Sequence, residues 1–241
     1  MRIDLSPLDA ALERRAPVLW WRDDDAVAAT PALDRLLALA ESVEAPLVLA
    51  SIPAYVTAGL ARRLESARSV AVAVHGWTHE SHAPEGEKNA EFGAHRPLAD
   101  RIAEAERGLG VIGEMFGKRA LPVFIPPWNR IASDMPEALV GAGFRGLSVY
   151  GEREPRRDPL PRFDAHLDPI DWRGSRSAVD GAGFVARICD LMESDAPIGL
   201  MTHHLVHDEA IWELVEAVVG RMTARGARWV SLGDLIAPAV R

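Results

Sequence analysis

Three adjacent acids and a histidine pair are the side chains of this sequence best suited to chemistry. Asp23, Asp24 and Asp25 follow an apolar run, and His75 and His79 lie four residues apart with a glycine between them. Neighbouring carboxylates repel one another, so acids that follow a buried strand need a compensating cation. Two neutral imidazoles and one carboxylate bind a divalent ion and leave positions open for water and substrate. These residues predict a hydrolytic metal site.

Three further polar clusters also follow apolar runs directly. They are PPWNR at 126–130, DPIDW at 168–172 and THH at 202–204. Each one alone is typical of an ordinary turn, and an HxxxH pair arises easily by chance. All five clusters occupy the same kind of position, however, and the loops that leave the carboxyl ends of parallel barrel strands converge on one mouth. The coincidence favours one shared site.

The elements that must position these clusters are visible as a strand and helix alternation. Apolar runs lie at 17–21, 47–50, 70–74, 121–125, 146–149, 198–201 and 229–232. Amphipathic helical patterns lie at 31–43, 54–66, 98–116, 135–140, 183–193 and 209–225. Uniformly apolar strands alternating with helices predict an α/β fold with a parallel sheet covered by helices. Seven or eight units indicate a closed or nearly closed barrel; an open doubly wound sheet is the alternative, but no glycine-rich phosphate motif follows the first strand.

Composition narrows the class of protein. The chain has 241 residues, a single cysteine and a net charge of -8. We expect one domain over 1–241, no disulfide and no nucleic-acid partner. No apolar run reaches the length of a signal core or a membrane span, so we expect a cytoplasmic protein without a membrane segment. The polar stretches 80–96 and 151–161 are predicted to be surface loops at the rim of the site. The oligomeric state is left open.

Together the five clusters resemble the polysaccharide deacetylase family, the carbohydrate esterases related to the nodulation-type chitooligosaccharide deacetylases. The family's motifs occur in the same order: an Asp-Asp pair within 23–25, HxxxH at 75–79, a proline-rich turn with an aromatic at 126–128, DxxDW at 168–172 and LxxH at 200–203. The resemblance covers residues 17–236. It implies a distorted (β/α)7-type barrel of parallel strands with outer helices, one divalent metal ion with zinc expected, and removal of an acetyl group, first of all an N-acetyl amide, from a sugar substrate.

The resemblance also implies roles for individual residues. Asp24 is the expected general base and Asp25 the expected metal ligand beside the two motif histidines, if the turn aligns as Arg-x-Asp-Asp. Asp23 with Asp24 is the alternative pair. His203 is the expected general acid, donating a proton to the leaving amine, and His204 takes that role if the strand turns one residue later.

One departure from the family pattern concerns an arginine. The third motif normally has an arginine before its prolines that holds the catalytic Asp, whereas this chain has Ile125. Arg22 or Arg130 can restore the charge, and Asp171 is expected to orient the arginine or His203. The missing arginine motivates one alternative, a carbohydrate-binding barrel without turnover. Because some barrels of the type that this chain resembles act on other amides, a second alternative is a metal-dependent amidase for a small non-sugar amide.

Aromatic side chains within the motifs are the expected walls of a sugar groove. The chain has 7 tryptophans, and Trp77, Trp128 and Trp172 belong to the clusters. With Pro127 and Arg130 they are the expected substrate contacts, whereas the two tryptophans of the first strand are expected to pack in the core.

Overall fold

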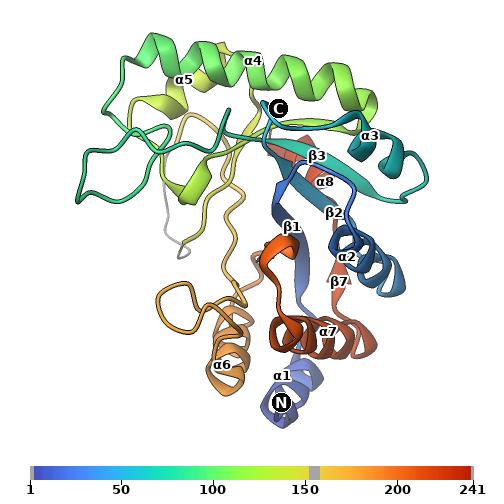
Figure 1. Ribbon diagram of the computed structural model, residues 1–241. Coiled ribbons are helices and arrows are strands. Elements are labelled where there is room, and N and C mark those ends of the chain that lie inside the picture. The colour runs from blue at the N-terminus through green and yellow to red at the C-terminus, as the bar shows by residue number, and fades with distance from the viewer. Residues whose placement is uncertain (1–2, 152–157, 240–241) are drawn as a thin grey trace.

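A curved sheet of parallel strands is the centre of the molecule (Figure 1). This computed structural model describes residues 3–151 and 158–239, and within them seven strands pair in the order β5-β4-β3-β2-β1-β6, with β7 also paired to β1. The strands are β1 (Val18–Ala26), β2 (Leu47–Ser51), β3 (Val70–His75), β4 (Ala120–Ile125), β5 (Gly146–Leu147), β6 (Ile198–Thr202) and β7 (Arg228–Trp229). All of their carboxyl ends therefore lie at one edge, where parallel barrels place their sites.

An extended segment between β5 and β6 completes the ring. Phe163 N–H donates to Leu147 O at 3.0 Å on the β5 side, and Met201 N–H donates to Leu167 O at 2.9 Å on the β6 side. Parallel bridges join Leu147 to Arg162 and Leu167 to Leu200. The sheet is thus a distorted barrel with outer helices, which confirms the expected fold.

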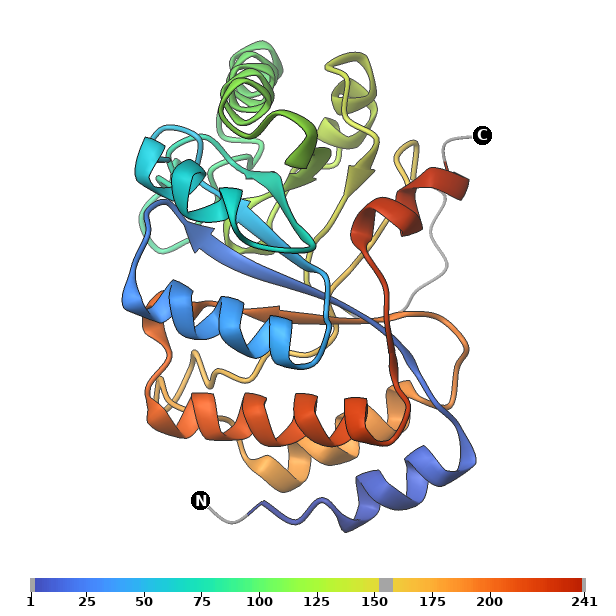
Figure 2. The ribbon, with the colours of Figure 1, turned by 90° about the vertical axis from the view of Figure 1, so that its right-hand side faces the viewer.

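Helices surround this sheet, and Figures 1 and 2 show α4 and α7 on opposite sides of it. The helices are α1 (Ser6–Arg14), α2 (Pro31–Ser42), α3 (Ala58–Glu65), α4 (Leu98–Phe116), α5 (Met135–Gly141), α6 (Gly181–Leu191), α7 (Glu209–Ala224) and α8 (Leu232–Ala239). Caps fix their first turns: Thr30 accepts from Leu33 N–H at 3.1 Å, and Asp208 accepts from Ile211 N–H at 2.9 Å. No helix in the described part of the chain is long and apolar enough to cross a membrane.

The core has two parts because side chains alternate across each strand. Trp21 packs in the larger cluster, between the sheet and the helices. Trp20 packs in the smaller cluster, with Val48 and Ala50 of β2 and Leu232 of α8. Both tryptophans are buried, as expected. The alternation also decides which polar residues of β1 face the barrel interior.

Some predicted boundaries were wrong. The acids of the first cluster lie within β1 itself, and α3 begins at Ala58 because Thr57 accepts the Leu60 N–H and caps it. The run 229–232 combines the end of β7 with the start of α8. Helices α1 and α8 were not predicted. Of the predicted rim loop 151–161, residues 152–157 lie outside the described part of the chain.

Candidate metal and catalytic site

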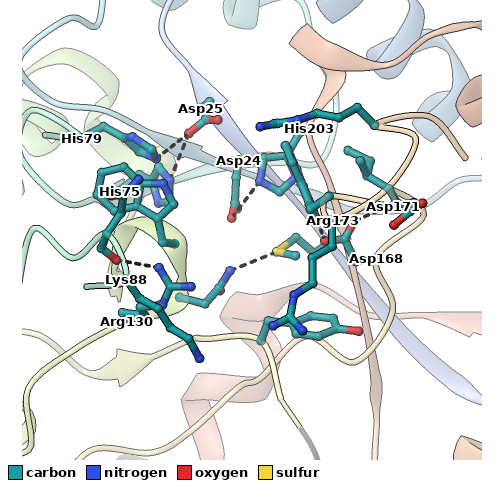
Figure 3. A pocket seen from close by; sticks show the side chains of 18 of the residues that line it. Asp24, Asp25, His75, His79, Lys88, Arg130, Asp168, Asp171, Arg173 and His203 are labelled. Carbon is teal, nitrogen blue, oxygen red and sulfur yellow. Dashed lines mark hydrogen bonds and ion pairs between the residues drawn. The ribbon is translucent and has the colours of Figure 1, made fainter. Parts of the chain in front are cut away.

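A β-bulge near the end of β1 directs two adjacent acids to the same site. Asp24 pairs with Ala50 of β2 and Ala26 with Ser51, so Asp25 is the extra residue, and its φ is 72°. In a regular strand, neighbouring side chains point to opposite faces. A bulge re-aims one of them. Asp24 and Asp25 therefore both line the same cavity (Figure 3).

Asp25, His75 and His79 form a cluster suited to a divalent metal ion, since one ligand atom from each lies within 4.8 Å of the others. Asp25 Oδ1 is 3.1 Å from His75 Nε2 and 3.4 Å from His79 Nε2. His75 Nδ1 lies 3.0 Å from Ile125 O, so a proton on Nδ1 leaves the Nε2 lone pair free for a ligand. Asp25 Oδ1 is buried and has no hydrogen-bond partner among the described residues. The donor set and this orphaned oxygen fit a metal ion.

Electrostatics keep the Asp25 carboxylate charged. Burial opposes ionisation, but the neighbouring imidazole of His75, together with His203 and His79, lowers the pKa of Asp25 well below its ordinary value. Burial and the charge of His75 lower the pKa of His79, which favours the neutral imidazole that a metal requires.

The ligand loop after β3 is held by a buried glutamate. Glu91 Oε1 accepts from Thr78 N–H at 2.7 Å and from Trp77 N–H at 3.2 Å. Gly76 has a φ of +62°, and a Cβ there would lie 2.1 Å from Glu91 Oε2. Burial raises the pKa of Glu91, although the amides of the loop oppose this. Only glycine fits between Glu91 and the turn, and the clamp sets the backbone that leads to His79.

Arg22 and Asp24 lie side by side on the inner face of β1. Arg22 Nε is 3.4 Å from Asp24 Oδ1, and both side chains are almost fully buried. Arg22 Nη1 donates to Ser148 Oγ at 2.9 Å, and Nη2 donates to Asn129 Oδ1. Arg22 thus places a positive charge beside Asp24. Arg130 is directed elsewhere, with Nη1 donating to Asn89 O at 2.7 Å.

Asp23 points to the other face of β1, where it pairs with His204. Asp23 Oδ1 contacts His204 Nδ1, while Oδ2 accepts from His204 N–H at 2.9 Å and from Thr202 Oγ1 at 2.7 Å. Both side chains are buried, and neither lines the cavity. Burial opposes the charged form of each, but the pair lowers the pKa of Asp23 and raises that of His204. Their arrangement joins β1 to the end of β6.

His203 faces the cavity opposite the metal cluster. Its Nε2 lies 3.9 Å from Asp24 Oδ2, and its ring meets the Trp172 ring edge-on at 4.9 Å between centroids. Trp172 Nε1 donates to Asp168 Oδ2 at 2.8 Å. Burial raises the pKa of Asp168, against the charge of His203. His203 N–H in turn donates to His207 Nε2 at 3.4 Å.

The cavity that joins these groups has a volume of about 980 Å³. Trp128, Arg130 and Trp172 line it, and their contact with a substrate stays a prediction. Trp77 and Pro127 are not among its described lining residues. The Trp77 ring packs against the core beneath the Arg107 guanidinium, which lies 4.3 Å from the ring centroid, so the prediction that Trp77 forms a sugar wall needs correction. Pro127 is buried, with its ring against Gly76.

Three residues of the site had no role in the sequence prediction. Asp168 was recognised only as part of the DxxDW motif, yet it lies in the cavity beside Trp172, whereas the Asp171 carboxylate accepts from Gly174 and Ser175 N–H of its own turn. Glu91 belongs to the predicted polar loop 80–96. The signal available in the sequence was its position between two apolar residues, Ala90 and Phe92, which the structure buries. Asn129 accepts a hydrogen bond from Arg22, and no signal of this contact exists in the sequence because it forms only in the folded chain.

Comparisons with known proteins identify relatives of this fold. No family model matches the sequence, and no curated protein matches it significantly. A CE4 esterase from Streptococcus mutans has a TM-score of 0.63 at 10% identity, with 92% of this chain and 87% of that one covered. A family 4 acetyl xylan esterase from Clostridium thermocellum, in complex with a cobalt ion, has a TM-score of 0.58 at 16% identity, covering 90% and 89%. A peptidoglycan deacetylase from Bacillus subtilis has a TM-score of 0.58 at 14% identity, covering 92% and 90%.

Proposed function

From a chain that has the fold of the polysaccharide deacetylases and family 4 carbohydrate esterases, we propose a metal-dependent hydrolase that removes an acetyl group from a carbohydrate, with an N-acetyl amide as the bond cleaved. One observation carries the proposal. The cluster of Asp25, His75 and His79 shares a cavity with a buried carboxylate, Asp24, and with His203 on the far side. The expected metal ligands, general base and general acid thus line one cavity.

Each side chain has a task in this reaction. Asp25, His75 and His79 would hold a divalent ion, with zinc expected, which would supply Lewis acidity to the acetyl carbonyl and to a bound water. Asp24 accepts the proton of the attacking water, and the guanidinium of Arg22 lies beside its carboxylate, with Nε 3.4 Å from Oδ1. His203 donates a proton to the leaving nitrogen. Trp128 and Trp172 supply flat apolar surface for a sugar ring.

The alternative of a binding protein without turnover rested on Ile125, at the position where the family pattern has an arginine. Arg22 supplies that charge from β1, so this reason for lost activity disappears. A small non-sugar amide gains no support from the volume of the cavity, about 980 Å³, which is at the upper end of the range for ligand pockets.

The test combines metal analysis with acetate release from a panel of N-acetylated sugars and sugar oligomers. We expect one divalent ion per chain, lost in His75→Ala and retained in Asp24→Asn. Both variants should lose about 100-fold or more in activity. Circular dichroism controls for folding. The proposal fails if the purified protein binds no divalent ion and His75→Ala releases acetate as fast as the unchanged protein.

A further inference from the structure

Cationic side chains line the cavity in the same number as acids, four of each, although the chain as a whole is acidic. The sequence carries a net charge of -8, yet four cationic side chains line this cavity: Lys88, Arg130, Arg173 and Arg176. We propose that the acetylated sugar bound here carries a phosphate group, which these side chains hold at the mouth. This inference rests on the proposed deacetylase function and names its substrate class.

The four cations remain available to a ligand. Within residues 3–151 and 158–239, none of them forms an ion pair with an acidic side chain. Arg130 donates to a neutral backbone carbonyl, that of Asn89. Arg176 lies 5.9 Å from the Trp172 ring centroid, a contact that leaves its charge uncompensated. An anion at the mouth would therefore meet several cations without displacing an acid from any of them.

Each acid of the same cavity lies beside neighbours of its own. Asp24 lies beside Arg22, and Asp25 belongs to the metal cluster. Asp168 accepts from Trp172 Nε1 at 2.8 Å and from Ile170 N–H at 3.0 Å. Asp171 accepts from backbone amides of its own turn. The acids of the cavity thus have neighbours of their own, while the four cations have no acidic partner among the described residues.

The cations also come from different loops and approach from two sides. Figure 3 shows Lys88 and Arg130 on the side of the cavity that holds His75 and His79, and Arg173 on the side that holds Asp168 and His203. A guanidinium matches phosphate oxygens with paired N–H donors. Cations on both sides suit a doubly charged phosphate better than a neutral sugar, which forms no ion pair with them. The acetyl group would then reach Asp24 while the phosphate stays at the mouth.

Three related compounds test the proposal: N-acetylglucosamine, its 1-phosphate, and UDP-N-acetylglucosamine. The second and third separate a simple sugar phosphate from a nucleotide-linked one. We expect kcat/KM for at least one phosphorylated compound to exceed that for the neutral sugar about tenfold or more at low salt, with the ratio falling as salt screens the charges. Calorimetry on the metal-loaded protein measures the dissociation constants of the same three compounds.

Charge-removing variants identify the groups responsible. Arg173→Gln and Lys88→Gln should each reduce the ratio of phosphorylated to neutral kcat/KM about threefold or more, because each removes one favourable charge from the mouth. Arg68→Gln, an exposed arginine outside this cavity, is the matched control and should leave the ratio unchanged.

The two proposals fail differently. If no compound releases acetate but the phosphorylated ones bind about tenfold more tightly, the proposed activity is wrong and the phosphate site stands. Equal binding constants and equal kcat/KM for all three compounds, unaffected by Arg173→Gln, would overturn the phosphate site and leave the deacetylase function untouched.

Discussion

Arg22 and Asp24 form a buried ion pair from alternate positions of one strand, with Nε 3.4 Å from Oδ1. Residues two apart share a strand face, so the positive charge needs no second element to reach the carboxylate. The family pattern instead places this arginine before the prolines that follow β4, where this chain has Ile125. The same charge thus reaches the site from a different strand.

Replacing Arg22 by methionine should both destabilise the protein and abolish activity. The change leaves Asp24 buried without a counter-charge, which costs about 3–5 kcal/mol. Urea denaturation measures the loss, and acetate release measures the activity. The double variant Arg22→Met with Asp24→Asn should recover part of the stability and none of the activity. Equal stability of Arg22→Met and the unchanged protein would show that the pair has no energetic role.

The two adjacent histidines should respond to substitution in different ways. His203→Ala should keep its metal and most of its stability, and lose about 100-fold or more in kcat, since His203 faces the cavity. His204→Ala should lose about 2–4 kcal/mol of stability, because it leaves Asp23 buried without its imidazole. Metal content, denaturation and acetate release on both variants decide the matter. The reverse pattern would make His204 the acid.

Glu91→Gln should weaken metal binding, although Glu91 is not one of the expected metal ligands. A carboxamide keeps one acceptor oxygen but turns an N–H₂ group toward the amides of Trp77 and Thr78, so the turn before His79 loses its fixed conformation. We expect the metal dissociation constant to rise about 10- to 100-fold. Glu85→Gln, exposed on the same loop, is the control. An unchanged dissociation constant in Glu91→Gln would refute the clamp.

Stability should fall as the pH is lowered below neutrality, partly through His207. Burial, with the charges of His203 and His204, lowers the pKa of His207 to about 4, although Asp23 and Asp208 oppose this. The unfolded chain, with a pKa near 6.5, then binds the extra proton first. Stability is complete above about pH 6.5 and declines toward pH 4, with a slope from this residue of at most about 1.4 kcal/mol per pH unit.

His207→Gln tests this slope, because glutamine accepts the His203 N–H and does not titrate. The free energy of unfolding, measured by denaturation from pH 7.5 to 4.5, should fall less in the variant than in the unchanged protein. Parallel curves for the two proteins would mean that His207 takes up its proton equally in the folded and unfolded states.

The fold followed from the sequence because its signal repeats. Most of the apolar runs are buried on both faces, and helices, several with capped first turns, separate the runs. The extended segment 161–167 escaped prediction because it joins the barrel through isolated bridges and contains charged residues, so it lacks an apolar run. Such pairing depends on the neighbouring strands and leaves little pattern in the segment itself.

The sequence predicted those site residues that lie at the ends of strands. The choice among Asp23, Asp24 and Asp25 was open because it depends on a bulge, and a bulge has no fixed residue signature. Strand alternation turns Asp23 away, and the bulge turns Asp25 back. Trp77 was misplaced because a tryptophan in a motif says nothing about the side to which its ring turns.

Strained backbone conformations are concentrated around the cavity. In the part of the chain that the structure describes, seven non-glycine residues have positive φ, and five of them line the cavity: Asp25, His79, Trp128, Asn129 and Arg176. Each left-handed residue costs of the order of 1 kcal/mol. Glycine at Asn129 would relieve this cost and release Arg22 Nη2 from its partner. Selection for heat resistance alone would therefore replace these site residues first. A bound metal ion, which binds only the folded chain, should stabilise these loops.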